Sequence, residues 1–458
     1  MAVLSFKSIV VLGLVSCAAL TVAQYNYGEA LEKSILFYEA QRQGRLPTTN
    51  RIPWRGDSFV NDRGQNGEDL TGGYFDAGDH VKFGFPFASS MSMLAWGMAD
   101  FKEGYVKAGQ WEQAKDALRW GLDYMIKIHP EPNVLYVQVG DGNRDHAYWG
   151  RPEDWPADDV RPALRATTSL PATEVAAEQA AAMAAASEIY RNEGDTAFAS
   201  TLLQHARDLY NFANTNRGKY SDSFPEAAQF YNSYSGFGDE LLWSAAWLYR
   251  VTNENNYQQD YQRFFTEFNL NGRPAEAAWD DKTAQAQVLL AKIDQSPVYV
   301  EAARNFCDWV VDEATKTPLG LVFISQWGSL RHASNVAFVC LQAAEAGINV
   351  DKYRAFAKQQ IDYVLGSTGR SFMCGFGNNP PQRPHHRASS CPNRPAPCDW
   401  QNYNSPDPNP QVLTGALVGG PNQQDQYTDD RNDYVSNEIA IDYNAGFQGA
   451  VAAIHKYN

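Results

Sequence analysis

The sequence predicts an all-α protein in which about twelve amphipathic helices pack as pairs and close into a ring. Apolar residues recur at helical spacing in one segment after another, whereas alternating strand patterns are scarce and no βαβ unit is recognisable. Short and very long connections alternate between the helices, and each helix must bury its apolar stripe against a neighbour. The predicted helices cover residues 28–44, 87–108, 110–128, 173–193, 195–217, 237–252, 256–269, 281–293, 296–314, 332–347, 350–365 and 435–456.

The N-terminal residues have the character of a secretory signal. Lys7 precedes an apolar run that ends at Ala23, and this run is too short to span a bilayer. The "TVA" before Gln24 has the small residues of a signal-peptidase site. We therefore expect residues 1–23 to be removed, residues 24–458 to form a single domain, and the protein to be secreted, with a digestive secretion as one plausible setting. No other stretch is predicted to cross a membrane.

Composition narrows the class of partner. The net charge of −15 at pH 7 disfavours nucleic acids and anionic membranes. Aromatic residues make up 13% of the chain, and their faces stack well on sugar rings. Five cysteines outside the signal are too few for a disulfide scaffold. Cys391 and Cys398 could form a disulfide. Cys307 and Cys340 lie in segments predicted to be apolar helices and are expected to be buried thiols. We expect a monomer.

The long loops (45–86, 129–172, 218–236 and 367–434) are where functional residues are expected. The first contains "GGYFDAGDHVKFGFP", residues 72–86, with Asp76 and Asp79 three residues apart around a glycine. Taken alone, this pair fits a turn, half of a metal site or two catalytic carboxylates. His80 is the one histidine adjacent to the pair, which makes metal-assisted hydrolysis the weaker reading.

A second group of acids lies near the C-terminus in "YTDDRNDYVSNEIAIDYNAGFQGA", residues 427–450. Asp430 and Asp433 are predicted to be acids of a helix N-terminus. Glu438 is predicted to lie early in an apolar helix, where burial would raise its pKa and suit it to donate a proton. Glycoside hydrolysis with inversion needs such an acid and a carboxylate base roughly 6.5–9.5 Å apart. Glu438 and the aspartate pair are candidates for these roles.

A third motif, "SFMCGFGNNPPQRPHHRASS" at residues 371–390, is a glycine- and proline-rich loop that brings His385, His386 and Arg387 to one place. Such side chains could donate hydrogen bonds to sugar hydroxyls, and a cation would keep nearby carboxylates ionised.

Together the three motifs resemble the family 9 glycoside hydrolases, the endo-β-1,4-glucanases or cellulases, over essentially the whole chain after the signal. The resemblance implies an (α/α)6 barrel and hydrolysis with inversion. It also implies that Asp79 is the general base, Asp76 holds the water and Glu438 is the general acid, with His385 and Asp429 completing the catalytic site. The C-terminal signature is matched by Tyr427, Asp429, Tyr434, Glu438, Asn444 and Ala445, and the loop signature by Gly377, Asn379, Pro384, His385 and Arg387.

The resemblance further implies sugar subsites and a structural calcium ion, and it implies no catalytic cofactor. Read from the residues alone, Asp239 and Glu240 are equally first-turn helix acids. His332 stands where many relatives have Tyr, and Cys374 where they have Ser, Thr or Val. The implied sugar-binding residues are Arg387, His146, Trp149, Tyr231, Trp327, Arg331 and Tyr443, and the implied calcium ligands are Ser235, Gly236, Asp239, Glu240 and Asp280.

We therefore expect an inverting endo-β-1,4-glucanase acting on cellulose and related β-glucans. Since the sequence ends at Asn458, soon after the C-terminal signature, we expect a catalytic domain alone, with an open cleft. One alternative is an enzyme of the same barrel acting on another β-glycan, such as chitosan oligomers. Another is a sugar-binding protein without catalysis, against which stands the retention of Asp76, Asp79 and Glu438.

Overall fold

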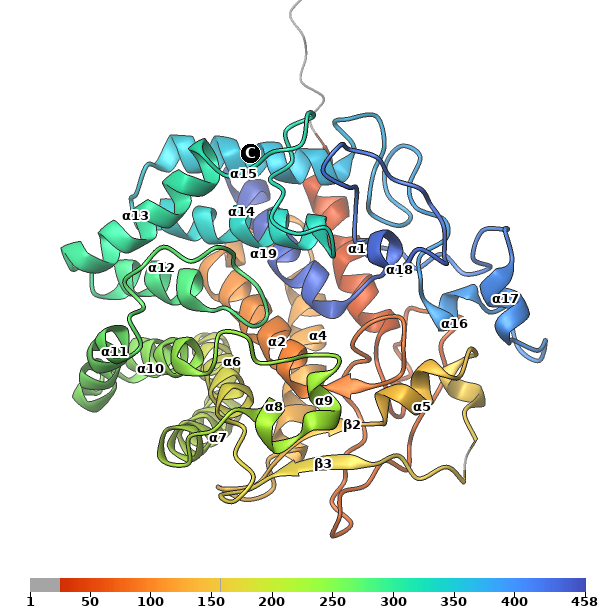
Figure 1. Ribbon diagram of the computed structural model, residues 1–458, viewed down its shortest axis with the longest axis horizontal. Coiled ribbons are helices and arrows are strands. Elements are labelled where there is room, and N and C mark those ends of the chain that lie inside the picture. Colours follow the sequence, from red (N-terminus) through yellow and green to blue (C-terminus); the bar gives the residue numbers. More distant parts are fainter. Residues whose placement is uncertain (1–24, 157) are drawn as a thin grey trace, which may run out of the picture.

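The computed structural model describes residues 25–156 and 158–458, so the predicted signal (1–23) lies outside the described part. Within these ranges there are twelve helices of eleven or more residues, as the sequence pattern predicts (Figure 1). The long helices are α1 (Tyr27–Ala40), α2 (Gly84–Asp100), α4 (Trp111–Lys127), α6 (Thr173–Asn192), α7 (Thr196–Thr215), α10 (Gly238–Thr252), α11 (Asn255–Glu267), α12 (Thr283–Ile293), α13 (Pro297–Asp312), α14 (Ser329–Glu345), α15 (Val350–Leu365) and α19 (Ile441–Tyr457).

Six of these helices form a closed inner ring. Around the ring α2 contacts α6, then α10, α12, α14 and α19 follow, and α19 returns to α2. Each inner helix also packs against one outer helix: α4, α7, α11, α13, α15 and α1, in the same order. The arrangement is an (α/α)6 barrel, and the predicted ring of helix pairs is confirmed.

Burial explains which helices lie inside. Inner helix α6 is buried from Thr173 through Ser187, since it has neighbours on every side. Outer helix α11 buries one stripe, formed by Tyr257, Tyr261, Phe264 and Phe265, and its other faces are polar or exposed.

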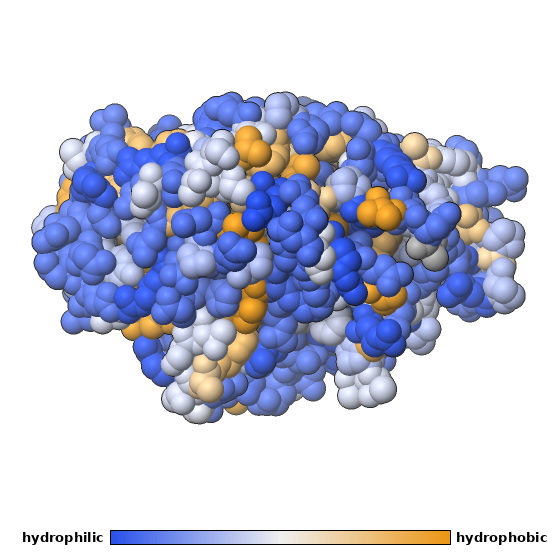
Figure 2. All heavy atoms as spheres, turned by 90° about the horizontal axis from the view of Figure 1, so that it is seen from below, coloured by the Kyte–Doolittle hydropathy of each residue, from blue (hydrophilic) through white to orange (hydrophobic). Residues whose placement is uncertain are grey.

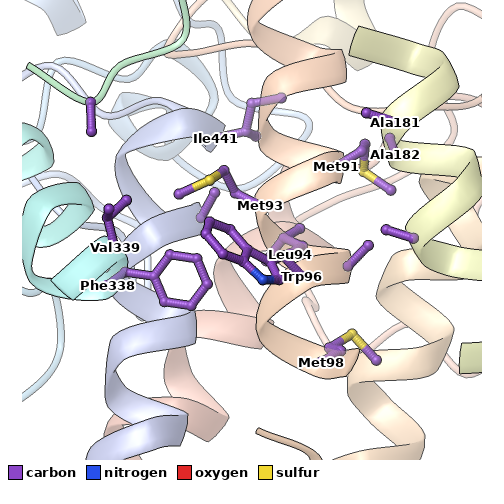
Figure 3. Packing of buried hydrophobic residues seen from close by; sticks show 14 of the residues in the cluster. Met91, Met93, Leu94, Trp96, Met98, Ala181, Ala182, Phe338, Val339 and Ile441 are labelled. Carbon is purple, nitrogen blue, oxygen red and sulfur yellow. The ribbon is translucent and has the colours of Figure 1, made fainter. Parts of the chain in front are cut away.

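Large aromatic side chains link the inner helices in the core. Trp96 of α2 is fully buried and meets Phe338 of α14 edge to face, with ring centroids 5.2 Å apart (Figure 3). It meets Trp243 of α10 in the same way at 5.1 Å. Edge-to-face pairs of this kind add to the free energy gained from burying their area. Three inner helices are thus joined through one side chain.

The structure departs from the predicted helices in two places. The predicted helix 87–108 is two helices, α2 and the short α3 (Lys102–Lys107), because the backbone leaves helical geometry at Phe101. The predicted helix 435–456 is also interrupted. It comprises α18 (Tyr434–Asn437) and α19, and the residues between them are extended.

The predicted loops contain a small antiparallel sheet that the sequence pattern did not reveal. Strand β2 (Leu135–Val139) pairs with β1 (Lys82–Phe83) on one side and β3 (Ala163–Ala166) on the other, with Lys82 opposite Val139. This pairing fixes the segment after Asp79 beside the segment before α5 (Gly142–His146).

Short helices from distant loops gather on one side of the barrel, where Figure 1 shows α5, α16 (Arg387–Ser390) and α17 (Trp400–Asn404) at the right. The remaining short elements are α8 (Tyr220–Ser223), α9 (Pro225–Ala228) and the 3-10 helix η1 (Pro152–Asp154).

The predicted pairing of Cys391 with Cys398 is present as a disulfide, and Cys307 and Cys340 are buried thiols, as expected. In the described part, every helix is too short or too polar to cross a membrane. The face in Figure 2 is mostly hydrophilic, with apolar residues scattered in small groups.

Candidate active site

The aspartate pair lies in an irregular loop that the backbone fixes in place. Asp76 donates its backbone N–H to the Val81 carbonyl (3.1 Å), which closes the loop on itself. The buried side chain of Gln41, just after α1, donates Nε2 to the Ala77 carbonyl at 2.7 Å. The two carboxyl groups are therefore presented by a rigid backbone and not by a flexible turn.

Gly78 brings the aspartate loop against the His385 loop. A Cβ at this position would lie 2.1 Å from the His385 carbonyl oxygen, far inside van der Waals contact. Arg387 donates its backbone N–H to the Gly78 carbonyl at 3.1 Å. Two motifs about three hundred residues apart thus share a backbone contact that only glycine permits.

Glu438 reaches the same place on an extended strand-like segment. The prediction that it lies early in a helix is wrong, because α18 ends at Asn437 and α19 begins at Ile441. His385 and Glu438 form a parallel β-bridge, and Gly419 donates its N–H to the Glu438 carbonyl at 2.8 Å. Ile441 then donates its N–H to the Asp76 carbonyl at 2.8 Å, which ties the acid segment to the aspartate loop.

The environment of Glu438 suits a proton donor. Burial raises its pKa to about 7, although hydrogen bonds from Trp327 Nε1 (2.8 Å) and the Tyr443 hydroxyl (3.2 Å) to Oε2 act in the opposite direction. The negative charge of Asp79 also raises this pKa. The pKa of Glu438 is therefore raised by burial, as expected, although the residue lies in an extended segment and not in a helix. A carboxyl group in this range can be protonated near neutral pH and can give up its proton.

The two aspartates have different surroundings. Burial, and then the charge of Asp79, raises the pKa of Asp76 well above its usual value. The Tyr231 hydroxyl donates to Asp76 Oδ2. Asp79 has one oxygen 3.3 Å from His146 Nε2, while its Oδ1 has no hydrogen-bond partner among the described residues. Two adjacent carboxyl groups resist ionising together, so burial and the neighbouring Asp79 both favour the neutral form of Asp76.

Three further predicted residues support this site. His385 lies in the bridge with Glu438 and its Nδ1 is 2.8 Å from the Arg431 carbonyl. Asp429 accepts the backbone N–H groups of Gln382 (2.8 Å) and Arg383 (2.9 Å), so it anchors the loop that leads to His385. Arg387 is buried and donates Nη1 to Asp145.

Comparison with known proteins identifies the chain. The model of glycosyl hydrolase family 9 matches residues 27–451, nearly the whole described part. The chain belongs to glycosyl hydrolase family 9. It is 45% identical to endoglucanase A of Bacillus pumilus, over 94% of this chain and 66% of that protein. It is 42% identical to endoglucanase 15 of Arabidopsis thaliana, with 98% of each chain covered.

Solved endoglucanase and cellulase structures share the fold. The endoglucanase of the termite Nasutitermes takasagoensis superposes with a TM-score of 0.93 at 53% identity, covering 95% of this chain and 100% of that one. The cellulase Cel9M of C. cellulolyticum, in a structure with cellobiose, has a TM-score of 0.88 at 36% identity and covers 95% of this chain and 99% of that one.

The predicted sugar-binding residues of this family 9 chain divide by exposure. Trp327 is 46% exposed and His146 has a side chain 46% exposed, so both can meet a ligand. Trp149 is only 3% exposed, with its Nε1 donating to Ser390 Oγ at 2.9 Å and its ring beside His385 and Tyr403. Trp149 is therefore packed among side chains of the His385 and Tyr403 segments, and its role in a sugar subsite stays a prediction.

The remaining predicted sugar-binding residues lie around the carboxyl groups. Tyr231 and Tyr443 hold Asp76 and Glu438 through their hydroxyls. Arg331 donates Nη1 to Asp442 at 3.0 Å. His332 is buried, with Nε2 2.9 Å from Arg331 Nη2, so the residue that differs from many relatives packs beneath an arginine.

The predicted calcium ligands form an acidic group at the start of α10. Glu240 is fully buried and neither of its carboxylate oxygens has a hydrogen-bond partner among the described residues. Burial and then Asp281 raise the pKa of Asp239 to about 7, and burial raises that of Asp280 to about 6. Asp239 and Glu240 also lie in the first turn of α10, so both readings of these acids agree with the structure. Asp239 accepts the backbone N–H of Lys282, and Asp280 accepts those of Tyr234 and Ser235. The unpaired carboxylate of Glu240 would suit a hard cation.

Two acids of the site were missed by the sequence analysis. Asp442 lies in the first turn of α19, pairs with Arg331, and its charge raises the pKa of both Asp76 and Glu438. Asp145 pairs with Arg387 beside Asp79. Asp145 directly precedes His146, and this position next to a predicted site residue could have indicated in the sequence that it belongs to the site.

Proposed function

We propose that this chain is an inverting endo-β-1,4-glucanase that hydrolyses internal bonds of cellulose and related β-glucans. One observation carries the proposal: a carboxyl group suited to donate a proton, Glu438, converges on a carboxylate pair, Asp76 and Asp79, through direct backbone hydrogen bonds. Family 9 membership and the endoglucanase relatives support the same activity.

The chemistry follows from the two protonation states. Glu438 gives its proton to the glycosidic oxygen as the bond to the anomeric carbon breaks. Asp79 takes a proton from a water molecule, whose oxygen attacks the same carbon from the opposite face. Asp76, held by the Tyr231 hydroxyl, is the second anchor of that water. Glu438 then regains a proton from solvent and Asp79 releases one, so the enzyme returns to its starting state.

Sugar recognition would use the exposed aromatic rings and the polar groups around the carboxyls. Trp327 and the exposed Tyr434 have ring centroids 5.5 Å apart, and Trp327 also touches Glu438, which places a stacking surface beside the proton donor. His146 and Arg387 offer donors for hydroxyls near Asp79. His385 and Asp429 keep the loop of Arg387 in position.

A structural calcium ion is part of the proposal. Asp239, Glu240 and Asp280 would hold it together with oxygen atoms of Ser235 and Gly236. Bound there, calcium would neutralise the buried acids at the start of α10. It would have no part in bond cleavage.

We also propose that the protein is secreted and works as a monomer. The signal-like N-terminus and the Cys391–Cys398 disulfide both suit an oxidising compartment.

The experiment is the release of reducing ends from carboxymethyl cellulose by wild type, Asp79→Asn and Glu438→Gln. Wild type should release them and lower the viscosity of the solution, while both variants should be nearly inactive. The first product should be the α-anomer by NMR. No release by wild type would reject the glucanase, and release from chitosan oligomers instead would favour the related β-glycan enzyme. A β-anomer would reject inversion.

A further inference from the structure

A carboxyl group that the mechanism does not use lies beside the base. Asp145 is on α5 and is only 4% exposed. One ligand atom each of Asp79, Asp145 and His146 lies within 4.8 Å of the others, the single group of this kind in the part of the chain that the structure describes. A carboxylate so close to the base must either oppose its ionisation or be compensated.

The compensating charge is the Arg387 guanidinium. Its Nη1 donates to Asp145 Oδ1, and both side chains are 5% exposed. The backbone N–H of the same arginine donates to the Gly78 carbonyl, one residue before Asp79. Arg387 is thus tied to the aspartate loop by its main chain, while its Nη1 donates to Asp145.

Asp145 also contacts the backbone just after Asp79. Its Oδ1 accepts the backbone N–H of His80 at 3.3 Å, and His80 directly follows Asp79. The charged and titratable groups around Asp145 are Arg387, Arg161, Asp79, His80 and His146. Burial holds the pKa of His80 well below its usual value, so the neighbouring imidazole is neutral, and Arg387 is the cation paired directly with Asp145.

An unpaired buried arginine would seek the nearest carboxylate. A carboxylate oxygen of Asp79 lies within 4.8 Å of one of Asp145, so without Asp145 the guanidinium could pair with Asp79 and occupy the oxygen that must accept a proton from water. In the structure the guanidinium is bound by Asp145, and Asp79 Oδ1 has no hydrogen-bond partner among the described residues.

We propose that Asp145 is a positioning residue of the reaction, which keeps Arg387 away from Asp79 and holds the Asp79–His80 backbone, so that the base stays free for water. The inference rests on the proposed function, because it assigns Asp145 a role toward that base.

The test is the pH dependence of kcat/KM on a soluble cello-oligosaccharide for Asp145→Asn and Arg387→Gln. Asp145→Asn removes a negative charge from beside the base and releases the arginine. The acid limb should move to lower pH by about one unit, and kcat should fall about tenfold or more with a smaller change in KM. In Arg387→Gln the cation is lost and the acid limb should move to higher pH.

Asp100→Asn is the matched control, because Asp100 is a buried aspartate paired with Arg250 (2.7 Å) at the far end of α2. It should lower thermal stability and leave the pH profile unchanged. If Asp145→Asn does not fold, Asp145→Glu, which keeps the charge, should retain the wild-type acid limb while Arg387→Gln still moves it upward.

The proposal would be overturned if both variants, Asp145→Asn and Arg387→Gln, had wild-type pH profiles. It would also be overturned if the acid limb moved in the same direction in both. Either result would leave the glucanase function intact. An inactive wild type would reject the function itself.

Discussion

Gly78 gives a sharp test of how the active site is assembled. In Gly78→Ala the new Cβ would lie 2.1 Å from the His385 carbonyl oxygen and 2.9 Å from His386 Cα. Ordinary contact begins near 3.4 Å, so the two loops must separate by roughly 1 Å. Both obstacles are backbone atoms, which no rotamer change can relieve.

Two costs determine how much stability and activity Gly78→Ala should lose. Overpacking of this kind costs about 1–3 kcal/mol of stability, which a large domain can survive. Displacement of catalytic groups by about 1 Å can cost about 100-fold in rate. We therefore expect Gly78→Ala to fold, to melt a few degrees lower, and to lose about 100-fold in kcat on carboxymethyl cellulose.

Gly272→Ala provides the control, since nothing lies within 4 Å of a Cβ at Gly272 and its φ is not positive. Activity should be measured as reducing ends released per enzyme, beside thermal melting curves for both variants. A Gly78→Ala enzyme with wild-type kcat would refute the reasoning, as would an equal loss in Gly272→Ala.

Three other perturbations address separate parts of the molecule. Trp327→Phe removes a hydrogen bond that lowers the pKa of Glu438, so the acid stays protonated to higher pH and the alkaline limb of kcat should move upward; a downward shift would contradict the assignment. Chelation by EDTA should lower the melting temperature and added calcium should restore it, whereas Glu240→Gln should melt at the same temperature with and without EDTA. Trp96→Ala should destabilise the barrel by about 3–5 kcal/mol in denaturant titration, and a loss under 1 kcal/mol would show that the core pairs matter less than their burial indicates.

The helical barrel was predictable because its elements are long and periodic. Segments such as 256–269 carry a clear apolar stripe, and short connections require neighbouring helices to pack as pairs. The small sheet was not predictable from local pattern. Strand β1 has only two residues, and β3 is an edge strand whose residues are mostly half-buried, so neither shows a hydrophobic alternation.

Site residues that belong to a sequence motif were predictable. Residues that reach the site only through long-range packing were not. Asp76, Asp79, Glu438 and His385 meet as expected. The break in the helix before Ile441 was missed because the residues "EIAIDYNAGF" have the apolar spacing of a helix. Backbone hydrogen bonds to Gly419 and the β-bridge to His385 override that local preference. The role of Asp145 depends on Arg387, which lies 242 residues away and is invisible to local patterns.

The extended Glu438 segment makes the spacing of the site depend on the main chain. The acid is held by main-chain bonds to Gly419 and the His385 segment, and the base loop is joined to the same stretch through Ile441 N–H and the Asp76 carbonyl. The spacing of the Glu438 and Asp76 segments is therefore set by peptide groups. Side-chain substitutions around the carboxyl groups should leave this spacing in place unless, as at Gly78, they push the backbone apart.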